Sequence, residues 1–195
     1  MVAGVAGVVA APVLVGIAAA IKIEAMVRPS ARGPVFFVEE RISRGAPFGL
    51  IKFRILDRAA LAGLGDGPTH IKHLELAGDQ HLTRVGRVLK RYYLDELPQL
   101  FNIIKGDMAL IGTRPWPAEL CEQEFARGIY RKKEMPAGLL GPVQAHKGDE
   151  ASPGGIALDL DYFESYKSLP LGRLVWLDLR IAARCLKVML EGKGL

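Results

Sequence analysis

Two carboxylates stand side by side near the middle of the chain, where Asp95 and Glu96 fall within "YYLDELPQLFNIIKGD" (residues 92–107). Adjacent acids are often solvated residues at the start of a helix. They can also carry phosphate chemistry, because a carboxylate is already deprotonated at neutral pH and can attack phosphorus to form an acyl phosphate. The second carboxylate could hold Mg²⁺, which takes one or two carboxylates together with substrate phosphates. The residue types alone leave both interpretations open.

Cations stand shortly before the acids, as a reaction at a diphosphate or a phosphate diester would require. The segment "HLTRVGRVLKRYY" (residues 81–93) predicts an amphipathic helix. Its predicted apolar stripe is Leu82, Val85, Val88 and Leu89, and its basic side is Arg84, Arg87, Lys90 and Arg91. Arg84, Arg87 and Arg114 are candidates for bidentate phosphate contacts. An ordinary helix with a solvated basic face would give the same pattern.

A second short helix should begin just after the acids. Pro98 suits the first position of a helix, Lys105 suits its last turn, and Gly106 suits the position just past its end. We therefore expect a helix over residues 98–105, with Asp95 and Glu96 ahead of its positive end.

The remaining patterns predict small elements around this centre. Residues 35–38 and 48–53 should form a hairpin or two short strands around "SRGAP", and residues 61–70 should form a surface loop. One helix is expected over residues 118–133, a short strand near Val143, and an amphipathic helix over residues 171–190. The last helix should place Leu174, Leu177, Ile181, Cys185 and Val188 on one face, and it suits either a core-facing position or the headgroup plane of a membrane.

The chain opens with an uncharged apolar segment, "MVAGVAGVVAAPVLVGIAAAI" (residues 1–21). As a helix it would match the hydrocarbon thickness of a bilayer, and Pro12 in its middle would kink or break it. Either a kinked span or a re-entrant helix that bends near Ala11 and Pro12 and returns to the same side fits the sequence. The excess of basic over acidic residues after this segment predicts that the following residues lie in the cytoplasm, whether the segment spans the membrane or is re-entrant.

Composition narrows the class of partner. The net charge is +5 and the sequence pI is about 9.3, which suits an anionic partner. The 26 basic residues are mixed with 21 acidic ones and form no polybasic tail, so we expect no nucleic-acid partner. Cys121 and Cys185 lie far apart and have no metal-ligand spacing.

Taken together, the motifs resemble those of the bacterial sugar transferases, the monotopic polyprenyl-phosphate phosphoglycosyl transferases. The resemblance covers nearly the whole chain. It rests on "GPVFF" (33–37), "PFGLIKFR" (47–54), "LTRVGRVLKR" (82–91), "LDELPQLFNIIKGDMALIGTRP" (94–115) and a C-terminal "LDLDYFESYKS" segment followed by "LDLRI".

The resemblance implies a reaction and a role for each matching residue. Asp95 would attack the β-phosphorus of a UDP-sugar and release UMP, and the covalent phosphosugar would pass to polyprenyl (undecaprenyl) phosphate. Glu96 would contribute to binding Mg²⁺. The basic positions suited to phosphate are Lys52, Arg54, Arg84, Arg87 and Arg114, and Gln99 and Asp159 match further motif positions.

The resemblance also implies an architecture and a location. The expected fold class is α+β and mostly helical, with interfacial amphipathic helices and a small β-hairpin. Residues 1–27 would form a re-entrant membrane-anchoring helix broken at Pro12, and residues 28–195 a catalytic domain that works as one unit with it on the cytoplasmic face of the bacterial inner membrane. The lack of further transmembrane segments suits the minimal form of the family, and whether it forms a homodimer stays open.

The chain departs from the family pattern at four places. The Ser-Pro pair of the re-entrant helix reads Ala11-Pro12, "GPRP" reads "GTRP" (112–115), the "RPG(I/L)TG" segment reads "MPAGLLG" (135–141), and the "QVNGR" segment reads "QAHKG" (144–148). None of these changes touches the acid pair. Two other functions remain as alternatives: a catalytically silent docking module on the membrane surface, and a glycosyltransferase that releases UDP.

Overall fold

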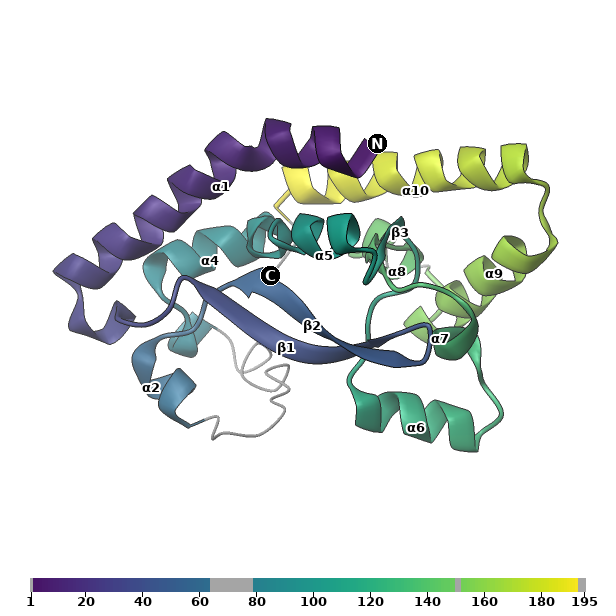
Figure 1. Cartoon of the computed structure of the whole chain (residues 1–195), viewed down its shortest axis with the longest axis horizontal. Helices are drawn as coiled ribbons and strands as arrows, with labels where there is room; N and C mark the ends of the chain where they lie inside the picture. Colours follow the sequence, from purple (N-terminus) through teal and green to yellow (C-terminus); the bar gives the residue numbers. More distant parts are fainter. Residues whose placement is uncertain (1, 64–78, 150–151, 193–195) are drawn as a thin grey trace. The chain divides into compact units, whose positions relative to one another are not determined.

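The computed structural model describes residues 2–63, 79–149 and 152–192, with side chains from residue 11 onward. It is mostly helical with two small two-stranded sheets, which confirms the predicted α+β class (Figure 1). The described chain divides into two compact units. The first unit runs to Glu40 and from Gly49 to Ile104, and the second comprises Arg41–Phe48 and the described residues from Lys105 onward.

The first unit contains the N-terminal helix and the elements around the acid pair. These are α1 (Val2–Val27), η1 (Pro29–Ala31), α2 (Arg58–Ala62), η2 (Asp79–His81), α4 (Arg84–Arg91), η3 (Leu94–Glu96) and α5 (Gln99–Lys105). The helix α5 begins one residue after the predicted start, and Gly106 follows it with φ +85°, the left-handed conformation that ends a helix. Most of the predicted loop over residues 61–70 lies outside the described residues, and its first two residues belong to α2.

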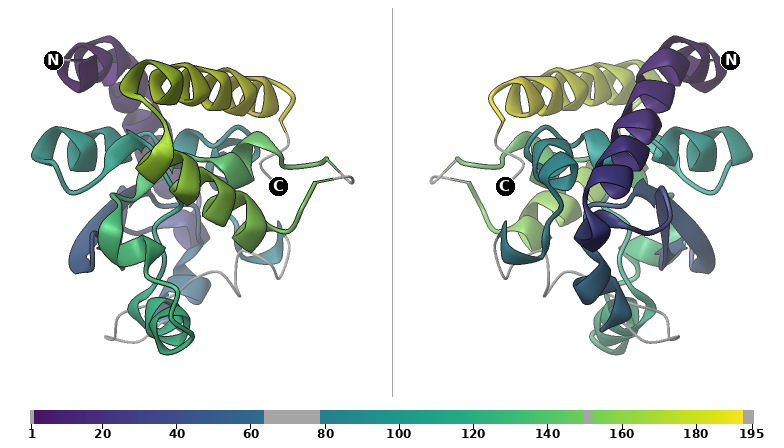
Figure 2. Two further views of the ribbon diagram at one scale, coloured as in Figure 1. Left: turned by 90° about the vertical axis from the view of Figure 1, so that its right-hand side faces the viewer. Right: turned by 90° about the vertical axis from the view of Figure 1, so that its left-hand side faces the viewer.

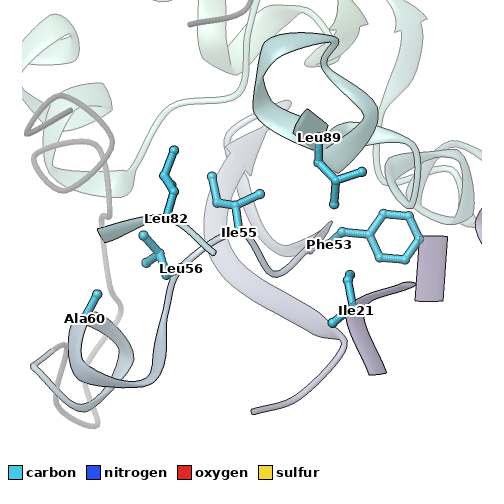
Figure 3. Close-up of a cluster of buried hydrophobic side chains, with 7 residues drawn as sticks. All are labelled: Ile21, Phe53, Ile55, Leu56, Ala60, Leu82 and Leu89. Atoms are coloured by element: carbon cyan, nitrogen blue, oxygen red, sulfur yellow. The ribbon is translucent and has the colours of Figure 1, made fainter. Parts of the chain in front are cut away.

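One apolar cluster holds the first unit together (Figure 3). Seven buried side chains converge there from α1, the end of the hairpin, the segment after it, α2, the segment before α4, and α4: Ile21, Phe53, Ile55, Leu56, Ala60, Leu82 and Leu89. Leu82 and Leu89 belong to the apolar stripe predicted over residues 81–93, although Leu82 lies just before α4, and Val88 is 55% exposed, contrary to the prediction. The C-terminal half of α1 is thus part of this core through Ile21.

The helix α1 is continuous through Pro12, so the predicted break at this residue is absent from the structure. The ribbon of its N-terminal part runs in a different direction from the remainder (Figures 1 and 2). Several apolar side chains of α1 are exposed: Val13, Val15, Ile23, Met26 and Val27. Among the helices that the structure describes, none combines the length and the hydrophobicity needed to cross a membrane.

The predicted hairpin is present and longer than expected, with β1 (Phe36–Ser43) paired to β2 (Ala46–Phe53). Its two-residue turn has Arg44 at φ +51° and Gly45 at φ +74°. Two consecutive left-handed residues form the turn type that matches the twist of paired strands, which explains the glycine of "SRGAP".

The second unit is built on a short parallel sheet that the sequence did not reveal. The strands β3 (Ala109–Ile111) and β4 (Gly138–Leu140) pair in the register Ala109↔Gly138 and Ile111↔Leu140. The strand expected near Val143 therefore lies a few residues earlier, and Val143 belongs to the helix α8 (Pro142–Ala145).

Four further helices complete the second unit: α6 (Ala118–Ala126), α7 (Arg131–Glu134), α9 (Gly155–Ser168) and α10 (Leu171–Leu190). The single helix predicted over residues 118–133 is wrong. Gly128 adopts φ +77° after α6 and lets the chain turn before α7 begins. The helix α10 has the predicted bounds, and Ile181 and Cys185 bury its predicted face against Met135, Ala145, Tyr162 and Phe163.

Replacing Gly138 by alanine should strongly destabilise the protein, because Gly138 on β4 touches the backbone of Gly112, the residue just after β3. A Cβ atom on Gly138 would lie 2.1 Å from the nitrogen and 2.5 Å from the Cα of Gly112. We expect a loss of about 3 kcal/mol or more, measured as the free energy of unfolding in urea. Gly172→Ala on α10 is the matched control, because nothing lies within 4 Å of its Cβ position, and it should leave stability unchanged or raise it. Equal stability of the two variants would contradict this close approach.

Candidate active site

The acid pair lies on a tight turn that follows a strained residue. Tyr93, at φ +56° and ψ +20°, is left-handed and directly precedes the single turn of η3 that carries Asp95 and Glu96. Both acids are buried, at 5% and 6% exposure. Left-handed backbone costs about 1–2 kcal/mol at a residue other than glycine, and buried carboxylates are costly as well. Such costs concentrate at functional sites, which favours a chemical role over a solvated turn.

An asparagine fixes the helix that follows the acids. Asn102, fully buried on α5, donates from Nδ2 to the Gly49 carbonyl at 2.7 Å, and its Oδ1 accepts the Ile51 amide at 3.0 Å. These two bonds tie α5 to β2. Gln99, a predicted site residue, lies buried one turn earlier on the same helix. Asn102 was not identified as a structural residue from the sequence, although a polar side chain within the apolar run "LFNII" could have indicated that role.

The basic helix α4 has a two-part cap at its N-terminus. The Oγ1 of Thr83 accepts the Gly86 amide at 2.8 Å. The carboxylate of Glu24, from α1, accepts the amides of Arg84 at 2.8 Å and Val85 at 3.0 Å. A charged group in this position is favoured by the helix dipole as well as by hydrogen bonding. Glu24 therefore joins the N-terminal helix to the helix that leads into the acid turn.

Replacing Glu24 by glutamine should loosen the start of α4. An amide keeps one acceptor oxygen and loses the charge, so we expect local opening to become easier by about 1 kcal/mol. Hydrogen exchange at the Arg84 and Val85 amides should then quicken about fivefold. Glu40→Gln, an exposed acid on β1, is the matched control and should leave both amides unchanged. Unaltered exchange in Glu24→Gln would refute its capping role.

The helix α4 exposes its arginines on one side and packs its glycine closely against the backbone of Ile55 on the other. Arg84 and Arg87 both lie on the exposed side. Gly86 faces the backbone of Ile55, where an added Cβ would lie 2.2 Å from the carbonyl oxygen. The structure thus brings both predicted phosphate contacts into the same unit as the acid pair.

Lys52 and Arg54 are more deeply buried than phosphate-binding residues on a surface would be. Lys52, at 5% exposure, lies 3.4 Å from the Glu39 carboxylate on the neighbouring strand. Arg54, at 2% exposure, donates to the carbonyls of Leu56, Ala31 and Pro34 at 2.6, 2.7 and 2.7 Å. Arg54 therefore organises the segment before β1, and its predicted contact with phosphate stays a prediction.

Arg114 and Asp159 belong to the second unit. Arg114 follows β3 and is half-buried. Asp159, at 1% exposure on α9, pairs through Oδ2 with Arg131 at 3.0 Å and Lys132 at 3.6 Å. Arg131 also binds the Glu124 carboxylate with two guanidinium nitrogens. Glu124, Arg131 and Lys132 form a buried charge cluster with Asp159 that sequence reasoning missed, since an "RKK" run usually marks a solvated surface.

The carboxylates available in the first unit fit a magnesium ion that is shared with a substrate. Within the described residues, no group of three or more His, Cys, Asp and Glu side chains could hold a metal alone. Glu96 supplies one carboxylate beside Asp95, and Mg²⁺ commonly takes one or two carboxylates, with substrate phosphates and water filling the other positions. The donor set therefore suits Mg²⁺ bound together with a diphosphate.

Comparison with known proteins connects these residues to a family. The family model described as "Bacterial sugar transferase" matches residues 1–192. The match thus includes both units and all of the predicted site residues.

Three relatives illustrate the similarity. An Aeromonas hydrophila protein named UDP-N-acetylgalactosamine-undecaprenyl-phosphate N-acetylgalactosaminephosphotransferase is 31% identical over 188 residues, 94% of this chain and 40% of that protein. A Caulobacter vibrioides UDP-glucose:undecaprenyl-phosphate glucose-1-phosphate transferase is 33% identical over 92% of this chain and 63% of its own length. The Sinorhizobium fredii exopolysaccharide production protein ExoY is 31% identical over 83% of this chain and 74% of its own length. The chain therefore spans between about two fifths and three quarters of these relatives.

Proposed function

Because the chain belongs to the bacterial sugar transferase family, we propose that it transfers a sugar phosphate from a UDP-sugar to polyprenyl phosphate. The observation that carries the proposal is the buried Asp95–Glu96 pair on its strained turn. The relatives named for sugar-phosphate transfer to undecaprenyl phosphate support the substrate classes. A docking surface would have no need to bury two adjacent acids.

In the first half-reaction, the Asp95 carboxylate attacks the β-phosphorus of the UDP-sugar. A carboxylate oxygen–phosphorus bond forms, and the bond from this phosphorus to the bridging oxygen breaks. The bridging oxygen leaves with the electron pair as part of UMP. The sugar phosphate stays on Asp95 as an acyl phosphate, whose anhydride bond is reactive enough to pass the group onward.

In the second half-reaction, an oxygen of the polyprenyl phosphate attacks the same phosphorus. The Asp95 carboxylate is the leaving group and returns to its starting state, and the product is a polyprenyl-diphosphate sugar. Neither half-reaction requires a separate base, because both nucleophiles are already anionic at neutral pH.

Positive charge must offset the repulsion between these anions. Arg84 and Arg87 on α4, with Lys52 and Arg114, are proposed to contact phosphate oxygens, where the planar arginine side chain allows paired hydrogen bonds. Glu96 would hold Mg²⁺ together with the substrate diphosphate. When bound, this ion neutralises phosphate charge and stabilises the departing phosphate oxygen.

The acceptor is a lipid, so the chain should work on a membrane surface. We propose that α1 enters one leaflet and returns at its bend, with the catalytic residues on the cytoplasmic face. Pro12 within the bent helix and the exposed apolar side chains of α1 support this topology. The helix α10 also carries exposed apolar residues such as Trp176 and Leu179, which suits a helix lying in the headgroup plane.

The product nucleotide tests the proposal against its alternatives. Purified protein would be incubated with Mg²⁺, a panel of UDP-sugars and undecaprenyl phosphate, and the nucleotides separated by chromatography. UMP is the expected product. Release of UDP would instead indicate a glycosyltransferase, and no nucleotide release with any sugar would indicate a docking module.

A further inference from the structure

The backbone on both sides of Arg114 is fixed by hydrogen bonds within the second unit. The Gly112 amide donates to the Leu140 carbonyl at 3.0 Å, and the Thr113 carbonyl accepts the Gly138 amide at 2.9 Å. On the other side, the Trp116 carbonyl accepts the Ile42 amide at 2.9 Å. The segment that carries Arg114 is therefore anchored before and after that residue.

The carbonyl of Arg114 itself is held by a buried lysine. The Nζ of Lys132, on α7, donates a hydrogen bond to it. The same ammonium lies 3.6 Å from the Asp159 carboxylate and 5.1 Å from the centre of the Trp116 ring. Lys132 thus contacts the two residues around Pro115 and an acid from α9.

A lysine at 2% exposure is an unusual choice for a purely structural contact. Burial lowers the pKa of Lys132 to about 8, which the attraction of Asp159 only partly offsets. Burial also raises the pKa of Asp159. Taking both groups out of water opposes their mutual attraction, so the Lys132–Asp159 pair alone is a weak stabilising contact.

The neighbouring Arg131 already supplies the main structural ion pairs of the cluster. It is fully buried, binds Glu124 and Asp159, and lies 5.0 Å from the Trp116 ring centre. Asp159 would therefore keep a cationic partner without Lys132. The contact that Lys132 makes and Arg131 does not is the hydrogen bond to the Arg114 carbonyl.

We propose that Lys132 is a positioning residue for Arg114: it fixes the backbone that carries the Arg114 guanidinium, to which the proposed function assigns a phosphate contact. The proposal rests on the proposed function. A guanidinium misplaced by about 1 Å can lower a rate by roughly a hundredfold. We therefore expect Lys132→Met to lower kcat/KM for the UDP-sugar by about ten- to a hundredfold.

A double-mutant cycle with Lys132→Met and Arg114→Ala, read as kcat/KM for UMP release, tests this role. If Lys132 acts through Arg114, Lys132→Met will reduce kcat/KM in the wild-type background and have little further effect beside Arg114→Ala. Lys133→Met is the matched control, because Lys133 is exposed and stacks on the rings of Phe125 and Tyr130. It should keep near-normal activity.

The pH profile of kcat/KM gives a second readout that a merely structural lysine would not move. The groups facing Lys132 are Arg131 on α7, Asp159 on α9, and Glu124 and Cys121 on α6. As the pH rises through about 8, Lys132 loses its charge and its hydrogen bond to the Arg114 carbonyl weakens. Wild-type kcat/KM should then fall severalfold, and this fall should be absent from Lys132→Met.

The outcomes separate the inference from the function on which it rests. Equal loss from Lys132→Met in both backgrounds, full activity of Arg114→Ala, or the same alkaline fall in wild type and Lys132→Met would each overturn the positioning role and leave the proposed function standing. A wild-type protein that releases no UMP would overturn both.

Discussion

Replacing Asp95 by asparagine is expected to reduce UMP release by about three orders of magnitude or more. The amide has nearly the shape of the carboxylate but is not a nucleophile, so no acyl phosphate can form. The buried turn of η3 should tolerate the change, since the side chain keeps its volume. The initial rate of UMP release with a saturating UDP-sugar measures the effect, and thermal unfolding checks that the variant is folded.

Asp161→Asn is the matched control for this experiment. Asp161 is an exposed acid on α9, and its replacement should leave the rate within about twofold of wild type, as is usual for surface changes. An Asp95→Asn protein with near-normal activity would rule out Asp95 as the nucleophile.

Replacing Arg131 by methionine should be the most destabilising single change in the buried charge cluster. Methionine fills similar space but leaves the carboxylates of Glu124 and Asp159 with less positive charge in a buried site. Removing one partner of a buried ion pair typically costs about 3–5 kcal/mol. The measurement is the midpoint of urea unfolding at neutral pH, with the slope of the transition checked for equality.

Arg127→Met provides the comparison, because Arg127 is exposed just after α6 and should change stability by less than about 0.5 kcal/mol. If Arg131→Met and Arg127→Met unfold at the same urea concentration, the cluster does not stabilise the second unit.

Local patterns in the sequence sufficed for the elements whose determinants are local. The helix α10 has the predicted bounds because its apolar residues recur at helical spacing and one face is buried by Ile181 and Cys185. The hairpin could be predicted because Gly45 marks a turn between two β-prone runs. The helix α5 could be placed from Pro98 and Gly106.

The features that depend on distant contacts could not be predicted. The sheet of β3 and β4 has three-residue strands whose pairing depends on the close approach of Gly112 and Gly138. The helix predicted over residues 118–133 failed because the left-handed Gly128 divides it. The acid pair of the candidate site, in contrast, could be predicted, because Asp95 and Glu96 are neighbours in the sequence.

The burial of several charged residues was equally hidden from the sequence. The run Arg131, Lys132 and Lys133 has the pattern of a solvated basic surface, and only the folded structure shows that Lys132 lies against Asp159 of α9. Arg54 was predicted as a phosphate-binding residue, and its bonds to three backbone carbonyls could not be anticipated from the sequence. Burial of such groups depends on partners far away in the chain, and local periodicity carries no information about them.

The most direct test of the proposed chemistry is the mass of the protein after reaction with a UDP-sugar in the absence of polyprenyl phosphate. The covalent mechanism predicts that rapidly quenched protein gains the mass of one sugar phosphate, that the added mass lies on the peptide containing Asp95, and that it disappears when undecaprenyl phosphate is added. An unmodified protein that nevertheless completes the transfer, or an adduct on another residue, would contradict Asp95 as the covalent nucleophile.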